Sequence, residues 1–590
     1  MAIFVVLPIV LASFIALLLK DYPKAVKGTA LLGSLVSLAL AILIFMNPPG
    51  AQSINWFNVA GTQFNITTMT APLNLILLML VAVMTVLIFA YSTGFMNMPS
   101  EQPRFYFEMG IFAAAMMLFA IAGSFITVFI AWEMLGVTSY LLIGFWYAKE
   151  GAADAARKAI TTIIIGDIAM LAAIIVLWNS YGTFEFSALL SIGSPGAPLA
   201  IAMALIAVAA FTKSAQFPFH EWLPDAMAGP TPVSAFLHSS TMVKAGVFLI
   251  AVLLPLFALA NLLYLLVAIG AITATIGVLN ALPERNIKRI LAYSTIEDLG
   301  LMFIALGFNA LFAAMMLFIV QTFYKALLFM NAGVVIKANN GEEDIYRVYG
   351  TSKNKLLTLM AIISVASIAG IVPFGGFFGK AAIEEAASGT YVYWILLALE
   401  LGSALYIFRW LFVPLRRTPD KNVQEIRSSY KVVPFSMRLA IYMLAAITLV
   451  SGSAYYLVPE YFHSIGYEPI SLESLLLGSA LVITAFVLAF FAYYKFKISF
   501  KLANHKALYA IVYNNIMTNK VYDGVAAAFG VWAAKAFGYF DYALDKTTYA
   551  LSGGVIAFGN AIKKIESGQM NLYAAMVLIG VIAILIMLML

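Results

Sequence analysis

Long uninterrupted runs of apolar residues recur from one end of the chain to the other. Each run is about 20 residues long, the length of a helix that crosses a lipid bilayer. The pattern predicts an all-α polytopic membrane protein. About sixteen predicted spans lie near residues 2–19, 25–46, 73–95, 105–122, 124–147, 160–178, 198–216, 232–253, 259–281, 288–306, 310–336, 355–372, 391–413, 435–457, 472–494 and 570–590.

Residues 505–565 break this pattern. Tyrosine and phenylalanine are frequent there, but a charge or a glycine interrupts the apolar residues every few positions. The segment favours one long amphipathic helix that lies laterally along the membrane surface or along a protein flank, with a reach on the order of 80 Å. The alternative is a pair of poorly apolar spanning helices.

The composition excludes several classes of protein. Hydrophobic residues make up 63% of the chain and charged residues only 11%, whereas soluble domains carry about 25% charged residues. The chain has no cysteine and four histidines, so disulfides, thiolate zinc sites and cysteine-ligated iron–sulfur clusters are excluded on this chain. If the protein takes part in redox chemistry, the electrons must travel on another subunit.

Lysine and arginine concentrate in alternate predicted loops. They occupy the odd-numbered loops, beginning with Lys20, Lys24 and Lys27, whereas the second loop, residues 47–72, has none. Cytoplasmic loops attract cations, so we predict a cytoplasmic first loop and an external N-terminus. The first span has no preceding positive charge, so we expect it to be retained rather than cleaved as a signal peptide. The net charge of +6 is then mostly this loop bias, and a basic patch for anionic partners such as nucleic acid is the weaker interpretation.

Several ionisable residues fall inside the predicted spans. Such a residue at the bilayer centre costs about 2.5–3.5 kcal/mol on insertion scales, so these residues must face a wet interior or one another. A buried lysine can take up and release a proton as a carboxylate approaches or withdraws, so the set predicts a proton or cation relay. The candidate residues are Glu133, Asp167, Lys213, His238, Lys244, Lys325, Lys380 and Glu400.

Other readings stay open for some of these residues. Asp167 could have a purely structural role, in which it caps a helix or pairs with Lys158 or Lys213. Glu297 and Asp298, in the tenth predicted span, could be packing anchors. Glu108 and Arg409 lie near span ends, where the side chains can reach the interface, so we expect no functional role for either.

Two predicted spans contain helix breakers. Proline interrupts the seventh at 213–218 and the twelfth at 370–376, and the freed carbonyls need polar partners or water. Spans four to eight and nine to thirteen would then form two five-helix units, each with one broken helix. Since five is odd, the second unit would be inverted relative to the first.

This reading divides the chain into six segments. They are three N-terminal spans (1–100), a first five-helix repeat (101–255), a second inverted repeat (256–415), spans fourteen and fifteen (416–504), the lateral helix (505–565) and a final anchor (566–590).

Five sequence stretches resemble one known family. They are KSAQFPFHEWLPDAMAGPTPVSAFLHSSTMVKAG (213–246), AWEMLGVTSYLLIGFWY (131–147), IKRILAYSTIEDLGLMF (287–303), FYKALLFMNAGVVIKA (323–338) and AGIVPFGGFFGK (369–380). The chain resembles the antiporter-like proton-channel subunits of respiratory complex I, membrane-bound hydrogenases, sulfur reductases and multi-subunit sodium/proton antiporters. YNNIMTNKVYDG (513–524) and the segment after it resemble the largest of these subunits, which carries the lateral helix.

The resemblance implies roles for residues already singled out. Glu133, Lys213, Lys325 and Lys380 match the family's central glutamate and lysines, and His238 and Lys244 lie on the linking eighth helix. The chain departs from the largest respiratory subunits at several positions, including Gln321, where those subunits carry histidine. These departures leave the exit route and the choice between H⁺ and Na⁺ open.

The resemblance also implies the setting. We expect an ion-translocating subunit of a redox-driven complex in a prokaryotic cytoplasmic membrane. No cofactor is expected on this chain; iron–sulfur clusters, flavin or a nickel–iron centre would lie on partner subunits. The expected partners are other membrane-arm subunits contacted by the lateral helix, peripheral redox subunits and lipids. The alternatives are a Na⁺/H⁺ antiporter subunit without a redox module, and a structural clamp with an idle channel.

Overall fold

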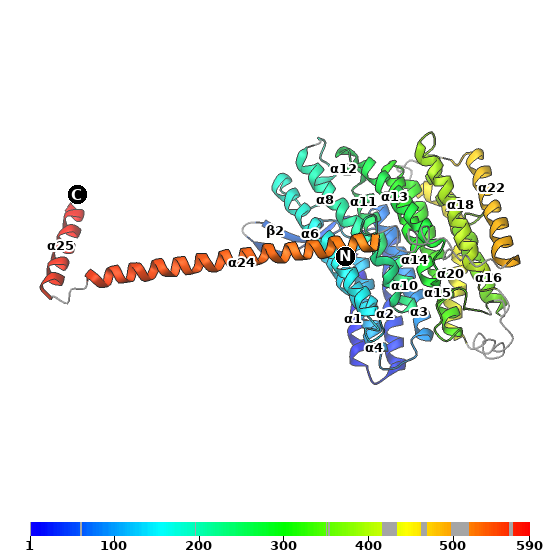
Figure 1. Ribbon diagram of the computed structural model, residues 1–590, viewed down its shortest axis with the longest axis horizontal. Helices are drawn as coiled ribbons and strands as arrows, with labels where there is room; N and C mark the ends of the chain where they lie inside the picture. The colour runs from blue at the N-terminus through cyan, green and yellow to red at the C-terminus, as the bar shows by residue number, and fades with distance from the viewer. Residues whose placement is uncertain are drawn as a thin grey trace. The chain divides into compact units, whose positions relative to one another are not determined.

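The computed structural model describes residues 2–59, 62–194, 196–349, 351, 354–415, 433–461, 469–496, 518–565 and 570–589. The chain divides into two compact units, Met1–Tyr513 and Asn514–Leu590. In the first unit, helices pack side by side as a bundle (Figure 1). The six segments predicted from the sequence stay a prediction.

The N-terminal part of the bundle holds the helices of the first predicted spans. A short 3₁₀ turn, Ala2–Val5, precedes them. The helices are α1 (Leu7–Leu18), α2 (Pro23–Met46), α3 (Pro72–Phe95), α4 (Gln102–Ala120), α5 (Phe125–Ile143), α6 (Ala152–Tyr181), α7 (Phe186–Leu189) and α8 (Ala197–Lys213).

The middle and end of the bundle continue the series. Its helices are α9 (Trp222–Asp225), α10 (Thr231–Ser239), α11 (Met242–Val252), α12 (Leu254–Leu259), α13 (Leu263–Ala281), α14 (Ile287–Gly307), α15 (Leu311–Ala338), α16 (Lys355–Ile368), α17 (Gly375–Ala386), α18 (Tyr391–Phe412), α20 (Phe435–Val450), α21 (Ala454–Tyr461) and α22 (Leu472–Ala489). Helices α10, α11, α14 and α15 are almost entirely buried and form the core.

The all-α polytopic fold is confirmed. Within the described residues, eleven helices are long and apolar enough to cross a membrane, and four shorter apolar helices accompany them. An apolar side chain that faces lipid needs no polar partner. This explains why leucine, isoleucine and phenylalanine are exposed on α2 and α22. The number of about sixteen spans and the inverted arrangement of the two five-helix units stay predictions.

Both predicted helix breaks are present. Helix α8 ends at Lys213, and residues 214–221 are irregular before α9. Helix α16 ends at Ile368 and α17 begins at Gly375. Residue Gly370 adopts a left-handed conformation, with φ +80°, which glycine reaches without a steric penalty.

A third break was not predicted. The eighth predicted span is two helices, α10 and α11, separated at Ser240 and Thr241. The Thr241 hydroxyl donates to the Phe236 carbonyl at 2.7 Å, so a side chain satisfies part of the interrupted backbone. Polar residues cluster at this point, but small hydroxyl residues also occur inside regular helices, so the pattern alone did not indicate a break.

A β-hairpin was also missed. Strands β1 (Gln52–Val59) and β2 (Thr62–Thr68) pair antiparallel, with Gln52 opposite Thr68 and a bulge between Asn55 and Phe57. Backbone bonds from Met69 to Ile121 at 2.7 Å and from Gly123 to Thr67 at 2.8 Å tie the hairpin to the α4–α5 connection.

The second unit contains two described helices. Helix α24 (Thr518–Ile565) is one continuous helix of 48 residues, and α25 (Met570–Met589) follows it (Figure 1). The sequence of α25 is apolar except for Asn571 and Tyr573 near its start. The single helix α24 agrees with the predicted long helix over 518–565 and not with the alternative pair of spanning helices. The start of that prediction, 505–517, lies outside the described residues.

Candidate functional site

A first cluster of ionisable side chains surrounds Lys213 at the end of α8. Its ammonium donates to the Trp132 carbonyl of α5 and lies 4.5 Å from the centre of the Trp132 ring. The indole nitrogen of Trp132 donates to Asp167 of α6 at 2.8 Å. Lys213 forms no ion pair among the described residues, so carbonyl and ring contacts, rather than a direct carboxylate, hold this buried cation.

Glu133 belongs to the same cluster but lies at its edge. Unlike Lys213, which is completely buried, Glu133 is half-buried. It interacts electrostatically with both Lys213 and Asp167 without touching either. The predicted Glu133–Lys213 relationship is therefore one of proximity. Asp167 accepts its hydrogen bond from Trp132 rather than from Lys158, which instead pairs with Asp225 at 2.8 Å.

His238 occupies an apolar cage on α10. Its ring centre lies 6.5 Å from that of Trp222 and 6.0 Å from that of Phe329. The side chain is 1% exposed, and neither ring nitrogen has a hydrogen-bond partner in the described part of the chain. Buried polar atoms are normally satisfied by protein or water, so a water molecule is the expected partner here.

Lys244 joins α11 to α15. It lies just after the break at residues 240–241, and its ammonium donates to the Phe318 carbonyl and the Thr322 hydroxyl of α15, both at 2.5 Å. Gln321, one residue before Thr322, is completely buried and has no partner for its amide among the described residues. Like His238, this amide needs water.

Lys325 begins a second cluster, in which direct ion pairs replace the looser contacts of the first. Its ammonium lies 3.1 Å from Asp298 of α14 and also donates to the Ser294 hydroxyl. The Tyr324 hydroxyl donates to the same Asp298 oxygen at 3.0 Å. Both charged side chains are fully buried. Asp298 is thus the counter-ion of a buried lysine.

Glu297 continues the cluster on α14. It lies 3.9 Å from Lys380 of α17 and accepts a hydrogen bond from the Tyr406 hydroxyl of α18 at 2.5 Å. Lys380 also donates to Ser403 at 2.7 Å. Because Glu297 and Asp298 are consecutive residues of one helix, they join Lys325 to Lys380.

Glu400 of α18 and Glu384 of α17 complete the cluster. They line a cavity of about 10 Å³ together with Glu297 and Lys380. Glu384 is 3% exposed and Glu400 4%. The sequence analysis did not single out Glu384, because it ended the twelfth span at residue 372, before α17. Its spacing of four residues from Lys380 was the available signal.

Two further expectations meet the structure differently. Glu108 was expected to reach the interface, but it is buried, at 4% exposed, and pairs with Arg104 at 2.7 Å. Arg409 was expected to reach the interface, but it is fully buried. Its guanidinium donates to the carbonyls of Ala281 at 2.9 Å and Glu284 at 2.6 Å, where it stabilises the C-terminal end of α13.

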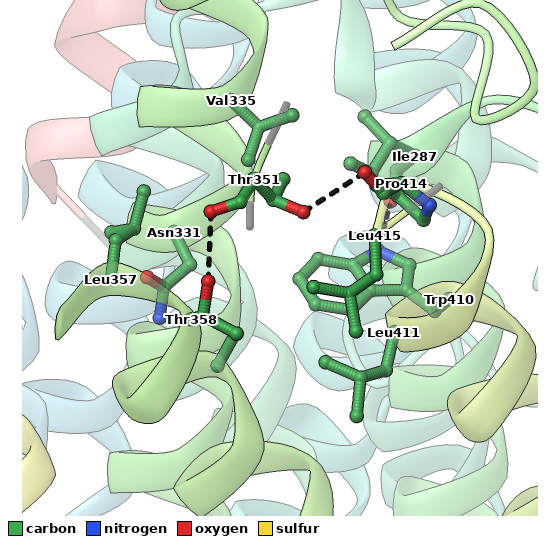
Figure 2. Close-up of a pocket in the computed structure, with 11 residues that line it drawn as sticks. Ile287, Asn331, Val335, Thr351, Leu357, Thr358, Trp410, Leu411, Pro414 and Leu415 are labelled. Carbon is green, nitrogen blue, oxygen red and sulfur yellow. Dashed lines mark hydrogen bonds between the residues drawn. The ribbon is translucent and has the colours of Figure 1, made fainter. Parts of the chain in front are cut away.

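Two other cavities differ sharply in character. One, of about 20 Å³, lies among α14, α15, α16 and α18; Figure 2 shows Thr351 donating to Pro414 and accepting from Thr358 at its wall. It is lined by uncharged side chains, so it has no group that transfers protons. The other, of about 320 Å³, is lined by charged residues that include Lys149, Lys158, Asp225, Arg289 and Glu343, and can hold water beside the ends of α6 and α14.

The chain matches two family models. The model described as "NADH:quinone oxidoreductase/Mrp antiporter, TM" matches residues 122–405, and "NADH-Ubiquinone oxidoreductase (complex I), chain 5 N-terminus" matches residues 56–106. The chloroplastic NAD(P)H-quinone oxidoreductase subunit 5 of Mesostigma viride is 31% identical over 94% of this chain and 91% of its own length. The chain belongs to the antiporter-like subunit family of complex I and Mrp complexes.

Other relatives match over a shorter length. NAD(P)H-quinone oxidoreductase chain 5 of Synechocystis sp. is 35% identical over 64% of this chain, but the match spans only 58% of that relative. Among solved structures, a chain of the Mrp complex from Dietzia sp. superposes with a TM-score of 0.69 at 25% identity, covering 98% of this chain and 62% of that one. An archaeal membrane-bound sulfane sulfur reductase shares the fold, with a TM-score of 0.67 at 20% identity over 83% of this chain and 99% of that one.

Proposed function

We propose that this chain translocates protons as a membrane subunit of a redox-driven, complex I-like assembly. The observation that carries the proposal is the series of buried bases and acids from Lys325 through Asp298 and Glu297 to Lys380. Burying charges inside a membrane protein is costly, and a scaffold would be served by apolar side chains. Family membership and the names of the relatives support the same function.

The first cluster would load protons and the second would release them, with Lys244 between them. Among the described residues, Ser214, Gln216, His238, Ser240 and Gln321 each have a buried side-chain atom without a hydrogen-bond partner. Water that satisfies these atoms would supply the hydrogen-bonded links. The ion is H⁺ in this proposal, since lysines are the repeated element and an ammonium repels metal cations.

The energy would come from electron transfer on other subunits. Moving one charge against 100 mV costs about 2.3 kcal/mol, and a shift of one pKa unit in a relay group corresponds to about 1.4 kcal/mol. Iron–sulfur clusters or a nickel–iron centre would lie on those partners, because this chain has no cysteine to ligate them; any flavin would lie there as well. Further membrane-arm subunits would contact α24, and the assembly would lie in a prokaryotic cytoplasmic membrane.

Substitution of the first cluster tests the proposal. In the reconstituted complex, Lys213→Ala and Glu133→Ala should each abolish most proton translocation while the complex still assembles, and the exposed Lys24→Ala should leave it unchanged. Unchanged pumping in both cluster variants would contradict the channel and leave the role of a structural clamp.

An Mrp-type antiporter subunit is the second candidate. The superposition with the Mrp complex over nearly the whole chain favours it. The two candidates differ in their partners, so the absorbance of the purified complex separates them. Flavin or iron–sulfur bands support the redox-driven assembly. Their absence, together with Na⁺-dependent proton flux, supports the antiporter.

The proposed orientation has its own test. The chain has no cysteine, so on this subunit a single introduced cysteine reports topology without background labelling. Lys20→Cys should react with a membrane-impermeant maleimide only from the cytoplasmic side, and Ser388→Cys only from the outside. Labelling of both from one side would contradict an external N-terminus and alternating loops.

A further inference from the structure

The second cluster contains more acid than base. Its carboxylates are Glu297, Asp298, Glu384 and Glu400, and its ammonium groups are Lys325 and Lys380. Fully ionised, the cluster would hold two uncompensated negative charges, and one would remain even with Lys244 counted. Unpaired buried charge is expensive, and such a site neutralises by binding a proton or another cation. The question is which group holds it.

Two of the four carboxylates, Glu384 and Glu400, lack a direct cationic partner in the described part of the chain. Lys325 pairs with Asp298, and Glu297 has both Lys380 at 3.9 Å and a hydrogen bond from Tyr406. Glu384 and Glu400, by contrast, form no ion pair within the described residues, and the Oε2 atom of Glu400 has no hydrogen-bond partner there. These two carboxylates are therefore the least compensated acids of the cluster.

The two glutamates share one cavity with Lys380, whose ammonium can donate a proton. Glu384 lies one helical turn beyond Lys380 on α17, about 6 Å along the helix axis. Both glutamates and Lys380 line the same cavity of about 10 Å³, which is close to the volume one water molecule needs. A proton can thus pass from Lys380 to either carboxylate through one water in this cavity.

The cavity lies near the end of the second cluster that approaches solvent. Helix α17 ends at Ala386, and Ser388 and Gly389 are exposed. Tyr391 is 92% exposed and Trp394 69%, as expected for aromatic residues at a membrane–water interface. Glu384 is then the last buried carboxylate before that interface.

We propose that Glu384 and Glu400 form an acid pair that holds one transferable proton, receives it from Lys380 and releases it to water beyond residues 388–389. This inference rests on the proposed proton-translocating function. In the transfer, an N–H bond of the Lys380 ammonium breaks and an O–H bond forms on one carboxylate, leaving a neutral amine and a carboxylic acid. The overall charge of the site does not change.

A bound metal cation is a poorer fit. The ammonium of Lys380 lines the same small cavity and would repel it. No group of three or more histidine, cysteine, aspartate or glutamate residues in the described chain is arranged to hold a metal.

Infrared difference spectroscopy on the purified complex tests the pair directly. The wild-type complex should show a protonated-carboxyl band that shifts in D₂O. Glu384→Gln or Glu400→Gln should remove it. Glu385→Gln is the matched control, since Glu385 bonds Ser471 and Ser474 instead of lining the cavity, and it should keep the band. A band present in all three variants, or lost only when Na⁺ replaces K⁺, would overturn the proposal.

Transport gives the second readout. Glu384→Gln should slow proton translocation on the order of 100-fold, as expected for loss of one proton-transfer group, and Glu384→Asp should restore part of the rate with a shifted pH profile. Five titratable groups face Glu384 and enter that profile: Lys380, Glu385, Glu297, Glu400 and Tyr393. If Glu384→Gln fails to assemble, Glu384→Asp carries the test, and an unshifted profile would count against the pair.

The two proposals fail in different ways. If Lys213→Ala transports normally and the Glu384 band is intact, the proposed translocating function is contradicted, but the protonated acid pair is supported. If Lys213→Ala abolishes transport but no carboxyl band depends on Glu384 or Glu400, only the proposal of the acid pair is contradicted.

Discussion

The two clusters place lysines in the same kind of membrane interior but compensate them differently. Lys213 is held by a carbonyl oxygen and the face of an indole ring, with Asp167 and Glu133 nearby but not in contact. Lys325 and Lys380 each have a carboxylate within 3.9 Å or less. A weakly compensated ammonium gives up its proton readily, whereas a paired one holds it. On the proposed function, this contrast fits protons that are loaded at the first cluster and held at the second until release.

The largest expected effect comes from removing one lysine of each type. Lys325→Met leaves Asp298 buried without its counter-ion, so it should lower the free energy of unfolding by about 3–5 kcal/mol. Lys213→Met breaks no ion pair in the described residues and removes only the hydrogen bond to the Trp132 carbonyl and the ring contact, so it should cost about 1–3 kcal/mol. Thermal and denaturant unfolding of the two purified complexes measures the difference.

Transport should not show the same contrast. Both variants lose a relay group, so both should lose most proton translocation. Equal destabilisation by the two substitutions would mean that Lys213 has a direct carboxylate partner in the assembled complex, and the distinction between the clusters would disappear.

A smaller effect should come from the neutral donors that hold one carboxylate in each cluster. Trp132 donates to Asp167 at 2.8 Å, and Tyr406 donates to Glu297 at 2.5 Å. Trp132→Phe and Tyr406→Phe each remove a hydrogen bond to a charged group, which should cost about 1.5–3 kcal/mol. Buried Tyr106→Phe is the control, since the Tyr106 hydroxyl has no partner in the described residues.

The pH dependence of transport sharpens this comparison. Loss of the donor should make each carboxylate easier to protonate, because the charged form loses a stabilising bond. The pH profile should therefore move toward higher pH in Trp132→Phe and in Tyr406→Phe, but not in Tyr106→Phe. A profile that moves only in Tyr406→Phe would mean that Asp167 takes no part in the relay.

The fold and the individual site residues were largely predictable, whereas their pairing was not. A helix in lipid must satisfy its own backbone, so each long apolar run marks a span, as for α3, α13 and α15. Charges inside those runs are rare enough to notice one by one. The partner of Lys325, however, lies on another helix, and the rotation of α14 against α15 is set by packing along their whole length.

Local irregularity explains the remaining misses. The hairpin of β1 and β2 and the break at residues 240–241 both arise from short polar stretches that carry little periodic signal. Glu384 was missed for a related reason: it follows a break, where a window that searches for 19 apolar residues has already stopped. Arg409 was misjudged because its partners are backbone carbonyls, of Ala281 at the end of α13 and of Glu284 just after it, and the sequence pattern does not reveal backbone partners.

The smallest expected effect concerns an ion pair outside the two clusters, which provides a reference for both. Glu343, in the connection between α15 and α16, lies 2.9 Å from Lys288 and accepts from Asn286 at 2.7 Å. Burial alone would raise the pKa of Glu343, but Lys288, Asn286 and Lys149 outweigh it and hold the pKa below its ordinary value of 4.5.

A carboxyl whose pKa is lowered by folding stabilises the protein fully above pH 4.5, and the stabilisation is lost as the pH falls from 4.5 through the folded-state value. Glu343→Gln should therefore lower the unfolding free energy by about 1 kcal/mol near neutral pH, as for a partly exposed pair, and by progressively less in acid. The exposed Glu150→Gln, which breaks no ion pair among the described residues, serves as the control. The measurement is the unfolding free energy of the wild type and of Glu343→Gln, from neutral pH into this acidic range. If the difference between the two proteins grows in acid, Lys288 does not stabilise the Glu343 carboxylate.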